Sequence, residues 1–229
     1  MRMRSSNPIA LVVLCVGLLV GCASKDKSDT SKQPAAPTAK TKFDTEKEPT
    51  ISADTRFAAG QLAESREDRV NAMKQYEEAV KLKPDHIKAL YRLGVVQAEL
   101  KMYPNAIETW KRYVKVTHES AAGYANLGFC YELSGDLKAA EGAYQKGIAK
   151  DAKNEPCRVN YGLMLARQDR MTDAVNNLRA VLTPAQVAYN IGSVHELRGK
   201  KEQAKVEYQK ALSLDPDFND AKQRLAALE

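Results

Sequence analysis

From residue 53 onward, hydrophobic side chains recur at intervals of three and four residues. Tyr124, Leu127 and Tyr131 show this spacing within one short segment. The spacing places apolar side chains along one face of a helix with about 3.6 residues per turn. The pattern therefore predicts a succession of amphipathic helices and an all-α fold.

The helical pattern repeats with small residues in phase. Glycines stand at intervals of 34 residues, with a last interval of 30: Gly60, Gly94, Gly128, Gly162 and Gly192. Twelve residues after each glycine stands an alanine, and four residues after that a large residue: Ala72 with Tyr76, Ala106 with Trp110, Ala140 with Tyr144, Ala174 with Leu178, and Ala204 with Tyr208. Antiparallel helices approach closely only where side chains are small. We therefore expect five helix pairs in which the glycine faces the alanine and the large residue fills the space beside the crossing.

Further small residues stand near the ends of the predicted second helices: Ala79, Gly147 and Ala211. We expect them to let the first helix of the next pair dock, although Tyr113 and Val181 take this place in two pairs. Pro84 and Pro216 end two of the second helices, because proline lacks an amide donor.

The fourth unit is four residues shorter than the others, and the missing length falls after Val181. This loss corresponds to about one helical turn. We expect a shortened second helix or turn there, with a local change of superhelical pitch. Residues 219–229 follow the last unit, with apolar side chains at Ala221, Leu225 and Leu228. They are predicted to form a cap helix that covers the end of the stack.

These positions resemble the tetratricopeptide repeat (TPR) family, whose unit of about 34 residues forms two helices. The resemblance covers residues 53–229 and predicts a TPR domain at 52–229, with repeat units at about 53–86, 87–120, 121–154, 155–184 and 185–218. It implies an all-α fold: an α-α superhelix, or TPR solenoid, of five helix pairs plus a C-terminal cap helix.

The first residues differ in composition from the repeats. Residues 1–21 have a basic start, an apolar run over 9–20 and a cysteine, Cys22, directly after Gly21. This arrangement predicts a bacterial secretion signal. Residues 19–22 resemble the lipobox of bacterial lipoproteins, which implies a palmitate-type lipid on Cys22. The alternative is an ordinary cleaved signal that ends in cysteine, but the abrupt change to polar sequence after Cys22 favours the lipoprotein.

Residues 22–51 are rich in Lys, Ser, Thr, Asp, Ala and Pro, and such a composition cannot form a core. They are predicted to be a disordered tether with a random-coil reach of about 30 Å. Without residues 1–21, which carry two arginines and no acid, the formal charge falls from +6 to +4. The remaining charge is only weakly basic, and no cluster of basic residues resembles a nucleic-acid-binding patch. We therefore expect no nucleic-acid partner.

The repeat alignment places Cys130 and Cys157 on neighbouring helices, seven positions out of step. That offset corresponds to roughly 10 Å along the helix axis. Because a disulfide needs Cα atoms within about 7 Å of each other, we predict two free thiols. The histidines do not suggest a catalytic or metal site either, since His86 and His118 fall in turns and His195 at a core position. We therefore expect no catalytic residue, metal, cofactor or small-molecule substrate.

The resemblance assigns a concave groove to the first helix of each pair. The residues that it places there are Tyr91, Arg92, Val95, Asn126, Phe129, Val159, Asn160, Leu163, Tyr189 and Asn190. Three of them, the asparagines, resemble a ladder that grips the backbone of an extended peptide, because an amide offers both a donor and an acceptor. Two alternatives stay open: asparagine is common at this place, and some of the apolar residues belong to the core.

The lipobox, tether and repeats together resemble lipoproteins that assist assembly of type IV and tight-adherence pili and their secretin channels. They imply a membrane-anchored scaffold or adaptor that binds a peptide segment of a protein partner in the bacterial cell envelope. We expect a lipid anchor in the outer membrane, facing the periplasm. An adaptor for peptidoglycan-remodelling enzymes is the alternative, and an enzyme would need an active site that the sequence pattern does not show.

Overall fold

The computed structural model describes residues 51–228, which belong to one compact unit. The predictions for residues 1–21, for Cys22 and for most of the 22–51 tether lie outside the described residues. Residues 51–228 form eleven α-helices and no strand: α1 (Ala53–Ser65), α2 (Arg69–Leu82), α3 (Ile87–Glu99), α4 (Tyr103–Val116), α5 (Ala121–Leu133), α6 (Leu137–Lys150), α7 (Glu155–Arg167), α8 (Met171–Arg179), α9 (Pro184–Leu197), α10 (Lys201–Leu214) and α11 (Asn219–Ala226).

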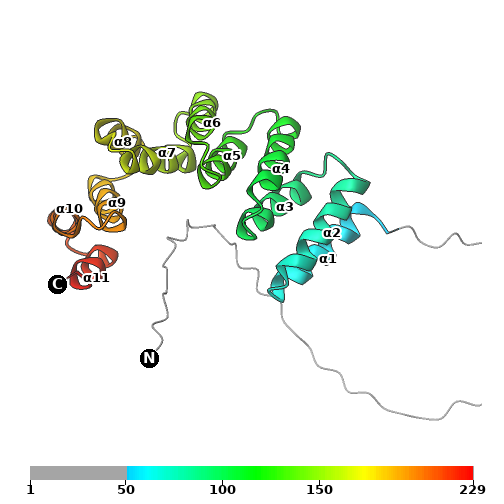
Figure 1. Cartoon of the computed structure of the whole chain (residues 1–229), viewed down its shortest axis with the longest axis horizontal. Coiled ribbons are helices and arrows are strands. Elements are labelled where there is room, and N and C mark those ends of the chain that lie inside the picture. The colour runs from blue at the N-terminus through cyan, green and yellow to red at the C-terminus, as the bar shows by residue number, and fades with distance from the viewer. Residues whose placement is uncertain (1–50, 229) are drawn as a thin grey trace, which may run out of the picture. The chain divides into compact units, whose positions relative to one another are not determined.

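Consecutive helices pack in pairs, α1 with α2 through α9 with α10, and α11 packs on α10. Within this unit the odd-numbered helices lie along the inner side of a curved row and the even-numbered helices along its outer side, as α5 to α10 show most clearly (Figure 1). The predicted all-α superhelix of five helix pairs and a terminal helix is confirmed.

Within each pair the glycine makes room for the large residue of the second helix. A methyl group on Gly94 would lie 2.6 Å from the indole ring of Trp110, and one on Gly128 would lie 2.6 Å from the ring of Tyr144. The nearest neighbour of each of these glycines is thus the large residue, although a methyl group on Gly162 would also lie 3.1 Å from the backbone oxygen of Ala174, the alanine predicted to face it. The physical reason is that a flat aromatic ring needs the space next to the backbone, which only glycine leaves free.

Between pairs, one small and one larger residue face each other. A side chain on Gly147 of α6 would collide with Sγ of Cys157 on α7. At the junction of α4 and α5 the sizes are reversed: Tyr113 takes the place of the small residue, and a methyl group on Gly123 would lie 3.0 Å from the Tyr113 ring. The helices α4 and α5 therefore still pack closely, because the small residue stands on α5 (Gly123) and not on α4.

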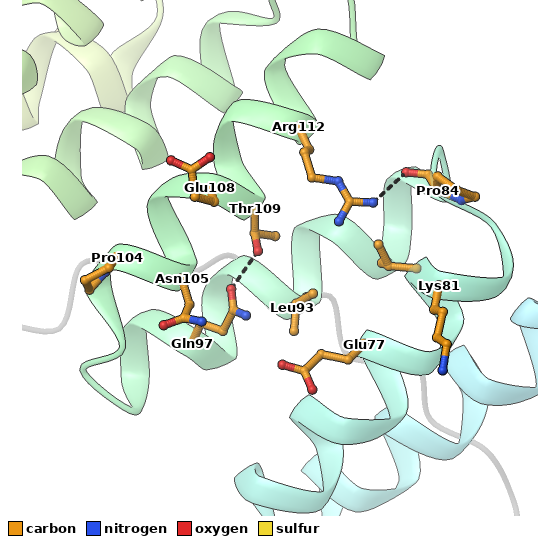
Figure 2. A pocket seen from close by; sticks show the side chains of 11 residues that line it. Glu77, Lys81, Pro84, Leu93, Gln97, Pro104, Asn105, Glu108, Thr109 and Arg112 are labelled. Atoms are coloured by element: carbon orange, nitrogen blue, oxygen red, sulfur yellow. Dashed lines mark hydrogen bonds between the residues drawn. The ribbon is translucent and has the colours of Figure 1, made fainter.

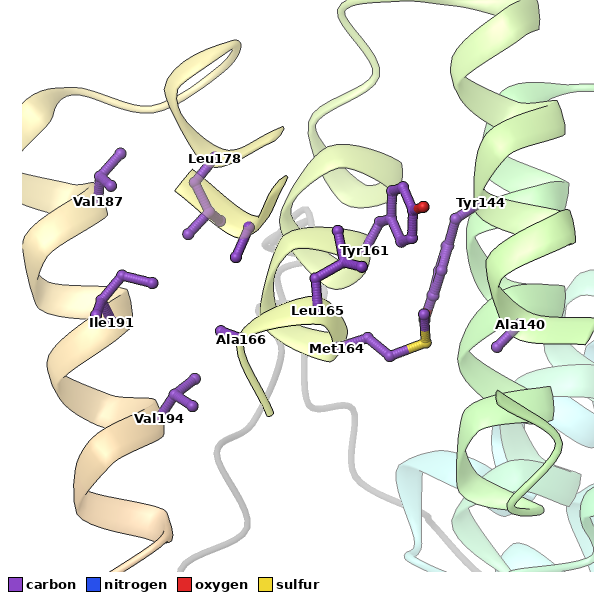
Figure 3. Packing of buried hydrophobic residues seen from close by; sticks show 11 residues of the cluster. Ala140, Tyr144, Tyr161, Met164, Leu165, Ala166, Leu178, Val187, Ile191 and Val194 are labelled. Atoms are coloured by element: carbon purple, nitrogen blue, oxygen red, sulfur yellow. The ribbon is translucent and has the colours of Figure 1, made fainter. Parts of the chain in front are cut away.

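The second helix of the fourth pair, α8, has 9 residues, whereas the other second helices have 14. The prediction that about one turn is lost here is confirmed. The core is nevertheless continuous across this unit, because Tyr144, Leu165, Leu178 and Ile191 belong to one buried cluster that runs from α6 to α9 (Figure 3).

Cys130 and Cys157 are buried and unpaired, as predicted. Burial raises the pKa of each thiol to about 12. Cys157 also donates a hydrogen bond to the carbonyl oxygen of Ala121, with an S–O distance of 3.3 Å. Both thiols are therefore part of the packed core.

His86 has a structural role that the sequence pattern did not indicate. Its Nδ1 atom accepts a hydrogen bond from the backbone N–H of Ala89 over 3.1 Å and so caps the start of α3. Its Nε2 atom lies 3.1 Å from Oδ1 of Asp54 on α1. The histidine thereby ties the first pair to the second.

Candidate functional site

All ten predicted groove residues lie on odd-numbered helices, along the inner row of the superhelix. They occupy α3 (Tyr91, Arg92, Val95), α5 (Asn126, Phe129), α7 (Val159, Asn160, Leu163) and α9 (Tyr189, Asn190). Their surroundings differ, however, so the ten residues do not form one uniform surface.

Several of the apolar residues are packed against the core. Val95 is only 9% exposed and belongs to the cluster around Trp110, so its assignment to the groove surface is corrected. Val159 and Leu163 are half-buried against the central cluster of the molecule. The ring of Tyr91 packs edge-on against Trp110, with 5.4 Å between ring centroids. These side chains form the floor of the inner face, not its accessible edge.

Other apolar side chains on the inner row remain accessible. Phe129 on α5 is half-buried, and Leu133 at the end of the same helix is 41% exposed. At the end of α9, Leu197 is 64% exposed. Exposed large apolar residues are costly in water, and a group of them on one side of a molecule is typical of an interaction surface.

The three asparagines are not equivalent. The side-chain amides of Asn126 and Asn190 donate hydrogen bonds to the carbonyl oxygens of Ala122 and Gln186, over 3.0 and 2.8 Å, four residues earlier in their own helices. Asn160 is 9% exposed and faces less solvent than the other two. The predicted ladder is therefore corrected to two accessible amides, each with its oxygen as the acceptor that no described residue uses.

Arg92 is held by the preceding pair. Its Nε atom donates to Oε2 of Glu64 over 2.9 Å, and the hydroxyl group of Tyr76 donates to the same carboxylate. Burial, together with the nearby Glu64 carboxylate, raises the pKa of Tyr76. Arg92 therefore lies on α3 as predicted, partly exposed, and its charge is neutralised by the Glu64 carboxylate.

The same arrangement of tyrosine, glutamate and arginine recurs in alternate pairs. Tyr144 donates to Glu132 over 3.2 Å, and Glu132 forms an ion pair with Arg167 of the next unit. The third instance joins Tyr208 to Glu196 over 2.6 Å and Glu196 to Arg224 of α11 over 3.3 Å. These contacts link the end of one unit's first helix to the following unit.

In the second and fourth pairs, the tyrosine is replaced by Trp110 and Leu178. The position of the glutamate is then taken by Ala98 and Ala166. Neither replacement presents a hydroxyl group that needs a carboxylate partner. Residues twelve apart therefore change together along this chain, and this pairing is visible in the sequence itself.

Two cavities lie between neighbouring even-numbered helices, and the repeat pattern did not predict them. The first, of about 690 Å³, lies between α2, α3 and α4 (Figure 2). On its floor the hydroxyl group of Thr109 donates to Oε1 of Gln97 over 2.7 Å, and on its rim Arg112 donates to the carbonyl oxygen of Pro84 over 3.3 Å. The second, of about 420 Å³, lies between α4, α5 and α6.

Within residues 51–228, no group of three or more His, Cys, Asp or Glu side chains is placed to hold a metal ion. In the same part of the chain, no helix is long and apolar enough to span a membrane.

Sequence models described as "Tetratricopeptide repeat" match residues 57–115 and 185–218. Among characterised proteins, the general transcriptional corepressor ssn6 of Schizosaccharomyces pombe is 23% identical over 170 residues. That match covers 73% of this chain but only 13% of the corepressor.

Two solved structures share the fold. MamA has a TM-score of 0.60 at 21% identity, over 73% of this chain and 94% of MamA. YrrB, described as a TPR protein with an unusual peptide-binding site, has a TM-score of 0.54 at 21% identity, over 76% of this chain and 92% of YrrB. Together with the matched repeats, these likenesses show that the chain contains tetratricopeptide repeats and that residues 51–228 form a TPR superhelix.

Proposed function

We propose that this protein is a membrane-anchored scaffold whose inner face binds a peptide segment of a protein partner in the bacterial cell envelope. The observation that carries this proposal is the exposure of apolar residues at the C-terminal ends of α5 and α9, two helices of the inner row. Leu133 and Leu197 are 41% and 64% exposed, and Phe129 lies one helical turn before Leu133. A partner that covered them would remove apolar surface from water.

The polar groups beside this surface fit an extended segment. Asn126 and Asn190 each keep a side-chain oxygen that can accept from a backbone N–H of the bound chain. An extended chain exposes its backbone groups and alternates its side chains between two faces. A segment with apolar residues at alternate positions could therefore pack its side chains on the leucines and hydrogen-bond its backbone to the asparagine amides.

The anchor is proposed from the sequence. Cys22 follows an apolar run that ends in Gly21, and polar residues begin directly after it. Two or three acyl chains on this cysteine would hold the protein stably at a bilayer. In the form that we favour, the anchor lies in the outer membrane and the repeats face the periplasm, where they would serve the assembly of a pilus or of its secretin channel.

A photocrosslinking amino acid at position 197 in living cells tests the binding face. Val206 on α10 is the matched control, because it is 60% exposed but lies on an outer helix. We expect position 197 to capture a discrete partner that position 206 does not. Capture of a pilus or secretin component would support the favoured form, and capture of a peptidoglycan hydrolase would replace it. Identical products from both positions, or none from position 197, would contradict binding by the inner face.

A further inference from the structure

The groove between α4 and α6 is kept open by small residues. Ala139, Gly142 and Ala143 stand on the side of α6 that borders the cavity. A methyl group built on Gly142 would have nothing within 4 Å, whereas one on Gly128 or Gly147 would collide with a neighbouring side chain. Gly142 is therefore not needed for helix packing, and its lack of a side chain leaves the groove accessible.

The floor of this groove is apolar and aromatic. Tyr124 and Leu127 on α5 are mostly buried and contribute to the floor, and Tyr131 on the same helix is half-buried. A volume of about 420 Å³ leaves room for a large side chain of a partner. An aromatic or branched aliphatic side chain would fit this floor, since it would bury apolar surface on both molecules.

The charged residues that line the groove are both lysines. Lys111 stands on α4 and Lys146 on α6, and no carboxylate lines the cavity. Lys111 pairs with Glu108 over 2.6 Å, but Lys146 forms no ion pair within the described residues. The Glu119 carboxylate, which accepts a hydrogen bond from the hydroxyl group of the floor residue Tyr124, is already bound by Lys150. The groove therefore carries a net positive charge.

The equivalent groove one unit earlier has a different character. The cavity between α2 and α4 is lined by two carboxylates, Glu77 and Glu108, as well as by Lys81 and Arg112. Its floor carries the hydrogen-bonded pair of Gln97 and Thr109, where the α4–α6 groove has Tyr131 and Ala143. An apolar floor with a purely cationic rim thus distinguishes the α4–α6 groove from its neighbour.

We propose that the groove between α4 and α6 is a second docking site, which takes an acidic peptide segment that inserts one apolar side chain. The apolar floor receives the inserted side chain, while one flanking carboxylate pairs with Lys146 and another competes with Glu108 for Lys111. This site lies between two outer helices, with its floor on α5, and uses none of the residues proposed to bind the first partner, so it goes beyond the proposed function. It would allow one scaffold molecule to hold two partners at the same time.

The probe is a fluorescein-labelled pentapeptide with one phenylalanine flanked on each side by two glutamates. Fluorescence anisotropy measures its binding to a fragment of residues 48–229, which is a compact unit with its own cores. We expect a Kd below about 1 mM at low salt. An analogue with glutamines in place of glutamates should bind at least about fivefold more weakly, because its two ion pairs are lost.

Gly142→Phe is the blocking variant, because the new ring enters the open groove. It should abolish binding of the acidic peptide, whereas Ala149→Phe, on an exposed position of the same helix, should leave it unchanged. Should Gly142→Phe fail to fold, Lys146→Glu at an exposed position provides the same test and should weaken binding at least about fivefold. The proposal is overturned if the acidic peptide does not bind, if the glutamine analogue binds equally well, or if a folded blocking variant binds like the original protein.

Discussion

The hydroxyl group of Tyr144 on α6 donates a hydrogen bond to Glu132 on α5, with 3.2 Å between the oxygen atoms. The ring of Tyr144 is fully buried, so its hydroxyl group depends on this carboxylate for a partner. Because Glu132 also pairs with Arg167 on α7, the contact joins two consecutive repeats. The equivalent contacts of Glu64 and Glu196 give the first and the last pair the same connection.

Glu132→Ala should lower the free energy of unfolding by about 1–3 kcal/mol, because the buried hydroxyl group loses its acceptor. Adding Tyr144→Phe to this variant should restore part of the loss, since no hydroxyl group then needs a partner. Urea unfolding measures the free energy of unfolding of the single and the double variant. As a comparison, Glu99→Ala removes an exposed ion pair with Arg69 and should cost less. Equal losses for Glu132→Ala and Glu99→Ala would contradict the role of the buried contact.

Two glycines that are close in sequence should respond oppositely to the same substitution. Gly128→Ala places a methyl group 2.6 Å from the Tyr144 ring and should cost about 1–3 kcal/mol of stability. Gly142→Ala meets nothing within 4 Å and should stabilise its helix by up to about 1 kcal/mol. Thermal or urea unfolding measures the stability of both variants. If both substitutions stabilised the protein, or both destabilised it, the proposed packing of the two glycines would be contradicted.

The two buried thiols predict a pH dependence. Their pKa of about 12 in the folded protein lies above the ordinary value of 9.0. Below pH 9 the thiols are protonated in both states and contribute no pH dependence. Between pH 9 and 12 only the unfolded state releases these protons, so the free energy of unfolding should fall as the pH rises.

Thiol labelling at pH 8 gives a more specific readout for the same residues. In a fragment of residues 48–229, Cys130 and Cys157 should react with a thiol reagent only as fast as the protein unfolds. Adding denaturant should make both react at the rate of exposed cysteines. Rapid reaction of either thiol in the native fragment would show that it is not part of the packed core.

Cys22→Ser should move the protein from the membrane fraction to the soluble fraction of the cell. The reason is that the proposed lipid is attached through the thiol, and serine cannot carry it in the same linkage. Fractionation followed by immunoblotting measures the change, and labelling with an azido fatty acid shows the lipid directly. Retention of the Cys22→Ser protein in the membrane fraction would contradict the anchor.

The repeated architecture was predictable because it follows from local sequence. Glycine recurs in phase, each pair is a short-range unit, and the missing residues after Val181 fall where α8 is short. What the glycines face was not predictable in the same way. Periodicity shows which positions are small, whereas the fact that Gly128 accommodates the Tyr144 ring depends on how the two helices rotate against each other.

The inner face was predicted less well, because equivalent places in a repeat have different neighbours. Val95 and Phe129 occupy the same place in successive units, yet Val95 is buried in the cluster around Trp110 and Phe129 remains half-exposed. Arg92 pairs with Glu64, a residue 28 positions earlier. Such a contact depends on the packing of one unit against the next, which the pattern of a single unit does not contain.

The central claim is that the inner face captures a protein partner. Its most direct test is quantitative co-purification of the crosslinked partner with a Phe129→Ser, Leu197→Ser double variant, compared with Val206→Ser on the outer row. We predict that the double variant keeps its helical content by circular dichroism and captures at least about tenfold less partner, because two apolar contacts are lost. Val206→Ser should capture as much as the original protein. Undiminished capture by the folded double variant would contradict the claim.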